Sequence, residues 1–151
     1  MSKTTGIAEI IQQAQSASSP ELIIDAVPYA RLLGMRSVYE PDDAGGALIF
    51  HLPPKKSNVG NPTLPALHGG AIGGFMEMAA TIHVLMSMDV VKVPRVVDFS
   101  IDYVRAGRYE DTWASCSVVR QGNKLVNVAI QTWQQDRDAS IATARAHFLI
   151  E

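Results

Sequence analysis

The 151-residue chain lacks the features of several protein classes. It has one cysteine, Cys116, so no disulfide can form within the chain and a cysteine-based metal site is not expected. The net charge is −2 and no basic cluster stands out, which argues against a nucleic-acid-binding surface. The opening stretch, MSKTTGIAEIIQQAQ, lacks the continuous apolar run of a secretion signal. These absences predict a cytoplasmic protein without redox or nucleic-acid chemistry.

What the chain does contain is a long apolar stretch from Ala66 to Val90. It is long enough for a membrane span, which needs about twenty apolar residues. Glu77, His68 and His83 lie inside it, and the rest of the composition, 47% hydrophobic and 19% charged, is that of a globular domain. We therefore expect a core helix that is wrapped by the rest of its own protein and does not cross a membrane.

The remaining elements predict a single domain around that helix. Residues 1–34 form an N-terminal helical extension of the same domain, with short helices at 5–17 and 20–34. Period-2 patterning and turn residues predict six strands, at 35–40, 44–52, 95–105, 111–119, 125–135 and 140–150. In the third strand, Val97, Phe99, Ile101 and Tyr103 alternate with polar residues, which is typical of a half-buried strand. The last four strands are joined by links of hairpin length, so we expect consecutive strands to run antiparallel.

The start of the long helix carries the motif LHGGAIGGFMEMAAT, in which His68 and Glu77 are nine positions apart. This motif resembles the His-Gly-Gly motif of hotdog-fold acyl-CoA thioesterases. The branch it resembles includes the phenylacetate-pathway (PaaI-like) and 4-hydroxybenzoyl-CoA thioesterases, which use a helix glutamate. The expected fold is α+β, a hotdog fold over residues 35–151 with an antiparallel sheet of about six strands around one central helix.

The resemblance implies an enzyme that hydrolyses an acyl-CoA thioester to a free acid and CoA. No metal or redox cofactor is implied, because CoA is part of the substrate. In this family the active sites lie at dimer interfaces, so the resemblance implies a homodimer or a dimer of dimers. Glu77 is then expected to attack the thioester carbonyl or to activate water, and both roles stay open. Thr81 matches a family position that helps to hold the acid or the water, although a helix hydroxyl also bonds to its own backbone.

Small residues share the face of the long helix that carries Glu77, including Gly70, Gly73, Ala80 and Thr81. Glycine in a helix interior costs about 1 kcal/mol relative to alanine, so the glycines need a structural reason. Close approach of a second helix or of a substrate is one reason. Tight packing of the helix on the sheet is the alternative.

The helix start also offers hydrogen-bond donors for the developing oxyanion. Free N–H groups and the positive end of the helix dipole favour negative charge there, so Gly69 is the first candidate donor and Gly70 the second. In the resembled family the histidine of the motif, here His68, fixes the loop at the start of the helix. Asn61 lies near the family position of an upstream polar partner, where Asn or Gln is common.

Coenzyme A also brings phosphate groups, which require cations. Arg105 and Arg108 flank Gly107 at a strand end and are the preferred candidates, with Lys55 and Lys56 as alternatives. His83 is interpreted as a core or interface histidine, because no nearby Asp, Cys or second His completes a metal site.

Three other functions are compatible with parts of the pattern. A hotdog dehydratase or hydratase also uses a helix acid, but those families place Pro-Gly at the helix start and the acid at a shorter spacing. A non-catalytic acyl-CoA-binding protein or a structural oligomer would leave Glu77 without a role. Within the thioesterase interpretation, Gly69 and Glu77 lie about 12 Å apart along one helix, too far to contact one thioester carbonyl together. We therefore expect a shared site between two chains whose long helices run antiparallel along the glycine stripe.

Overall fold

The computed structural model describes residues 6–41, 46–89 and 93–150. The helices are α1 (Ile7–Ala17), α2 (Glu21–Ala26), α3 (Pro28–Leu33) and α4 (Gly69–Ser87), with a single 3₁₀ turn, η1 (Lys56–Asn58). The strands are β1 (Arg36–Tyr39), β2 (Leu48–Leu52), β3 (Val59–Asn61), β4 (Ala66–Leu67), β5 (Arg95–Tyr103), β6 (Thr112–Gln121), β7 (Leu125–Trp133) and β8 (Ala142–Leu149).

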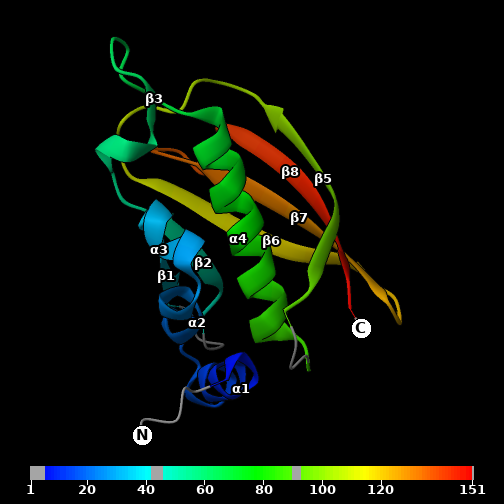
Figure 1. Ribbon diagram of the computed structural model, residues 1–151. Helices are drawn as coiled ribbons and strands as arrows, with labels where there is room; N and C mark the ends of the chain where they lie inside the picture. The colour runs from blue at the N-terminus through cyan, green and yellow to red at the C-terminus, as the bar shows by residue number, and fades with distance from the viewer. Residues whose placement is uncertain (1–5, 42–45, 90–92, 151) are drawn as a thin grey trace, which may run out of the picture.

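Six strands form one antiparallel sheet in the order β1-β2-β6-β7-β8-β5. The long helix α4 crosses one face of this curved sheet, and α1–α3 lie beside it (Figure 1). The predicted α+β hotdog fold, with six strands around one central helix, is confirmed. Its two edges are β1 and β5, so β5 pairs on one side only, with β8.

The core lies between α4 and the sheet. Phe75, Met76 and Ala79 of α4 are fully buried, and Phe50 of β2 and Phe148 of β8 are buried opposite them in the same cluster. Within the described residues, α4 is the helix with the length and hydropathy of a membrane span, and 56% of its apolar window is buried. Its place against the sheet is that of the expected core helix.

The N-terminal residues form three short helices, of which α1 and α3 contact α4. The predicted helix over 20–34 is instead two helices, because Pro28 follows Val27, whose backbone is extended (φ −99°, ψ 110°). A residue before proline is disfavoured in the α region, so the chain turns there and restarts with Pro28 in the first helical turn. Gln15 of α1 donates a hydrogen bond to the carbonyl of Leu85 (2.7 Å), which ties the extension to the last turn of α4.

The predicted alternation in β5 is shifted by a β-bulge between Val96 and Asp98. The extra residue moves Val96 into the inward position, so Val97 is 51% exposed, contrary to the predicted pattern. Phe99 and Ile101 face inward as predicted and contact the core, whereas Tyr103, at the end of the strand, is 53% exposed.

The link between β5 and β6 is a crossover rather than the predicted hairpin. These strands are antiparallel but not neighbours; they are three positions apart in the sheet, or about 14 Å at the usual strand spacing. Residues 104–111, here called the crossover loop, are long enough to span that distance, which is why link length alone did not separate the two topologies. The loop passes the start of α4, where the N–H of Leu67 donates to the carbonyl of Gly107 (2.8 Å).

Candidate active site

The first turn of α4 leaves one backbone N–H group available. His68 is the N-cap, and its Nδ1 accepts a hydrogen bond from the N–H of Gly70 (2.8 Å). The N–H of His68 itself donates to the carbonyl of Asn58 (2.8 Å). Within the described ranges the N–H of Gly69 has no partner. Of the two donors predicted for the oxyanion, Gly70 is therefore engaged by the cap and Gly69 is free.

Glu77 lies in the middle of α4 and is partly exposed. In the part of the chain that the structure describes, its carboxylate has no hydrogen bond or ion pair. Thr81, one turn later, is buried and donates its hydroxyl to the backbone carbonyl of Glu77 (2.9 Å). Of the two roles that the sequence left open for Thr81, the hydroxyl therefore makes the bond to its own helix backbone.

Two tyrosines of the same chain approach the glycine face of α4. The hydroxyl of Tyr103, from β5, donates to the carbonyl of Gly69 (2.6 Å) and lies near Gly73. From the other side Tyr29, in α3, covers Gly74, where an added Cβ would lie 2.3 Å from the tyrosine oxygen. The close approach predicted from the glycines is therefore present, but tyrosine side chains make it.

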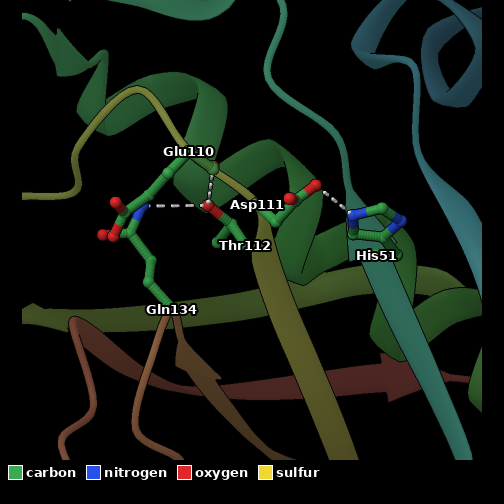
Figure 2. Close-up of polar contacts among 5 residues, drawn as sticks. All are labelled: His51, Glu110, Asp111, Thr112 and Gln134. Carbon is green, nitrogen blue, oxygen red and sulfur yellow. Dashed lines mark hydrogen bonds and ion pairs between the residues drawn. The ribbon is translucent and has the colours of Figure 1, made fainter.

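The crossover loop holds the predicted phosphate-binding arginines at the start of α4. The backbone N–H and carbonyl of Arg108 bond to the side-chain amide of Gln134 (3.1 and 2.8 Å), which also donates to Thr112 (3.1 Å; Figure 2). Arg105 and Arg108 line a depression of about 410 Å³ together with Gln134 and the acidic side chain of Glu110. The depression is large enough for part of a nucleotide-bearing ligand and carries two exposed guanidinium groups.

The far end of the same loop is anchored on the sheet. The carboxylate of Asp111 points toward His51 on β2 (Figure 2), with an oxygen 2.7 Å from Nε2, and the imidazole stacks on the indole of Trp113 (centroids 4.1 Å apart). These contacts explain His51 as an anchor of the loop on the sheet.

Two other candidates for substrate contacts are engaged in local structure. The ammonium group of Lys55 donates to the carbonyl of Leu32 (2.5 Å) at the end of α3, where a cation also favours the helix dipole. The side-chain oxygen of Asn61 accepts from the N–H of Thr63 (3.0 Å) and closes a turn. Lys56 is exposed, with its side chain free within the described residues.

Sequence reasoning missed Asn58, which connects three segments. It is 5% exposed, its amide donates to the carbonyl of Leu33 (2.9 Å), and its own carbonyl accepts from His68. A lone asparagine in a proline-rich loop gives no signal of burial. Gln134 was missed for the same reason. The side-chain amides of Asn58 and Gln134 bond to backbone groups of distant residues, and a sequence pattern does not show which backbone groups lie nearby.

The other notable titratable groups are not arranged for chemistry. Burial lowers the pKa of His83 and raises that of Cys116 above its usual range, so both are neutral near pH 7. Nδ1 of His83 is buried without a hydrogen-bond partner among the described residues. No group of three or more His, Cys, Asp or Glu side chains within residues 6–41, 46–89 and 93–150 is placed to hold a metal ion.

An antiparallel sheet around a long helix that carries a partly exposed glutamate, together with an amide at the helix start that has no partner among the described residues, is the arrangement expected of a hotdog-fold thioester hydrolase. Residues 64–141 match the family model of the thioesterase superfamily, and the chain belongs to that family. The resemblance inferred from the His-Gly-Gly motif is confirmed, and the protein is a hydrolase of this class.

Individual relatives agree with this assignment. The chain is 31% identical over 144 residues to the medium/long-chain acyl-CoA thioesterase YigI of Escherichia coli, covering 86% of this chain and 90% of YigI. A crystal structure from Chromobacterium violaceum is 40% identical, with a TM-score of 0.75 over 93% of this chain and 96% of that one. A Bacillus halodurans protein solved with CoA has a TM-score of 0.71 over 99% of this chain and 97% of its own, and at 20% identity it shows the fold alone.

Proposed function

We propose that this protein hydrolyses medium- to long-chain acyl-CoA thioesters, with the Glu77 carboxylate as the general base or nucleophile. The observation that carries the proposal is the Glu77 carboxylate on α4, which is partly exposed and has no partner within the described residues. An acid that served only to hold the fold would have a hydrogen-bond or charge partner. The substrate class is supported by the similarity to YigI, and the CoA portion by the Bacillus halodurans protein that was solved with CoA.

The proposed reaction begins at the thioester carbonyl. Either Glu77 removes a proton from water and the water oxygen bonds to the carbonyl carbon, or the carboxylate attacks and water later hydrolyses the anhydride. In both routes the carbonyl oxygen gains negative charge, which the free N–H of Gly69 stabilises. The carbon–sulfur bond then breaks, and the CoA thiolate leaves and takes up a proton. No metal or redox cofactor takes part.

The two catalytic groups are proposed to come from different chains. Both belong to the continuous helix α4, so in one chain they lie about 12 Å apart along its axis. The edge strand β5 is nine residues long and pairs on one side only. Pairing of two β5 edges about a two-fold axis sets the two α4 helices antiparallel and gives two equivalent sites per dimer.

The arginines of the crossover loop are proposed to bind the phosphates of CoA. They are exposed and lie on one depression. Gln134 bonds to the backbone of Arg108, and the hydrogen bond from Leu67 to Gly107 keeps the loop beside the start of α4. Lys55 is less suited, because its ammonium group already caps α3.

The test is hydrolysis of an acyl-CoA series, followed by Glu77→Gln. The amide keeps the size of the carboxylate but loses its basicity and nucleophilicity, so kcat should fall at least about a hundredfold while substrate binding and folding persist. Glu9→Gln, on the exposed face of α1, is the matched control and should keep full activity. Near-full hydrolysis by Glu77→Gln would refute the mechanism. Single turnover in oxygen-18 water separates the routes, since label in Glu77 indicates the anhydride and label only in the released acid indicates direct attack by water.

A further inference from the structure

Tyr29 stands out among the residues that the catalytic scheme does not use. It lies in α3, is 44% exposed, and within the described residues its hydroxyl has no hydrogen-bond partner. By contrast, the hydroxyl of Tyr103 is bonded to the carbonyl of Gly69. The Tyr29 ring packs against Gly74 but is not part of the hydrophobic core, so core packing does not explain its position.

The position of the ring relative to Glu77 follows from helix geometry. The tyrosine oxygen lies 2.3 Å from where a Cβ of Gly74 would be, and ring atoms lie 3.0 Å from it. Positions 74 and 77 share a helix face with Cβ atoms about 5–6 Å apart, so the hydroxyl is within about 8 Å of the Cβ of Glu77. That distance covers the reacting carbonyl and the first carbons of the acyl group. α3 and β5 lie on opposite sides of α4, so Tyr29 and Tyr103 flank its open face (Figure 1).

We propose that Tyr29 is a specificity-determining residue, forming the wall of the acyl site beside the reacting carbonyl. This inference rests on the proposed function. The ring narrows the space above Gly74, so unbranched acyl chains fit, and acyl groups with a branch or a ring next to the carbonyl are excluded. Gly74 is required because any side chain there would displace the wall. The N-terminal extension thereby supplies part of the site.

The test compares a straight-chain acyl-CoA such as octanoyl-CoA with 2-methyl-branched acyl-CoA and benzoyl-CoA. Tyr29→Ala opens the wall and should raise the kcat/KM ratio of bulky to straight-chain substrate at least about tenfold, the scale of steric discrimination in apolar pockets. Tyr29→Phe keeps the ring and should change the ratio less than about twofold. Tyr39→Ala, a tyrosine of similar exposure on β1, is the matched control and should leave the ratio unchanged.

A second measurement tests the contact without activity. Alanine at position 74 collides with Tyr29, so Gly74→Ala should fail to raise Tm in the wild-type background. In the Tyr29→Ala background the collision is gone, and the better helix former should raise Tm. Equal Tm changes in both backgrounds would overturn the proposed placement of the ring. An unchanged substrate ratio in a folded, active Tyr29→Ala variant would overturn the specificity role. A wild-type protein that hydrolyses no acyl-CoA would instead refute the proposed function.

Discussion

A mixture of two inactive variants tests whether each active site draws on two chains. Gly69→Pro removes the free N–H, and proline is tolerated there because it opens the helix. The preceding residue, His68, already has the extended backbone (φ −66°, ψ 132°) that a proline requires. Glu77→Gln removes the acid. In the proposed dimer, each variant alone then lacks one of the two catalytic groups at both sites.

The expected recovery follows from the two-fold symmetry. If each site takes Gly69 from one chain and Glu77 from the other, a mixed dimer has one doubly damaged site and one intact site. Random reassortment makes half of the dimers mixed, so the mixture should regain roughly a quarter of wild-type activity. With about 12 Å between the two groups on one helix, a site within a single chain would bring no recovery.

The assay is thioester hydrolysis after the variants are unfolded and refolded together, compared with simple mixing of the folded proteins. Gly69→Ala is the matched control. Its Cβ meets the Tyr103 ring at the same 3.3 Å that proline's Cβ does, but it keeps the N–H, so it should retain activity. Circular dichroism checks that each variant folds. Mixed dimers that are folded yet as inactive as either parent would refute the shared site.

Three further outcomes are expected. Replacing Arg105 and Arg108 together by alanine should raise KM with little change in kcat, because ground-state binding of CoA is lost; an unchanged KM at low ionic strength would move the phosphate site elsewhere. Asn58→Ala leaves a buried carbonyl at the end of α3 unpaired, which costs about 1–3 kcal/mol and should lower Tm by several degrees, whereas Asn61→Ala in an exposed turn should change Tm little. Burial lowers the folded-state pKa of His83, so its contribution to stability is full above the unfolded pKa of about 6.5 and is lost as pH falls from there toward the folded pKa. Urea titrations at pH 7 and pH 5 should show a smaller acid destabilisation for His83→Gln than for wild type, and an equal one would refute this assignment.

The fold could be predicted because its signals are periodic. The apolar stretch around Phe75 and the alternation at Phe99 and Ile101 follow from which faces are buried, and both were confirmed. The β5–β6 crossover was not predictable, because eight residues suffice both for a hairpin and for a three-strand crossing. The bulge that turns Val97 outward adds one residue without any change in composition.

For the candidate site, the sequence indicates residues whose chemistry depends on residue type, such as the isolated acid in an apolar helix, and their catalytic roles stay predictions. The sequence could not indicate features that depend on three-dimensional contacts between distant residues. The sequence ranked Gly69 above Gly70, and the imidazole of His68 gives the physical reason by occupying the second amide. Tyr29 carried no signal, because its proposed role depends on a contact with a glycine forty-five positions away.

The proposed site assigns the two parts of the substrate to two parts of the polypeptide. The crossover loop, which carries the arginines, accepts a hydrogen bond from Leu67 just before α4, while Tyr29 of α3, in the N-terminal extension, lies against Gly74 in the middle of the helix. The acyl group and the CoA moiety are then read by segments some seventy residues apart in the chain. Substitutions in α3 can alter the acid that is released without disturbing the recognition of CoA. Selectivity for the acyl group can therefore evolve independently of the carrier, and exchange of residues 1–34 between related chains is a route to redesign it.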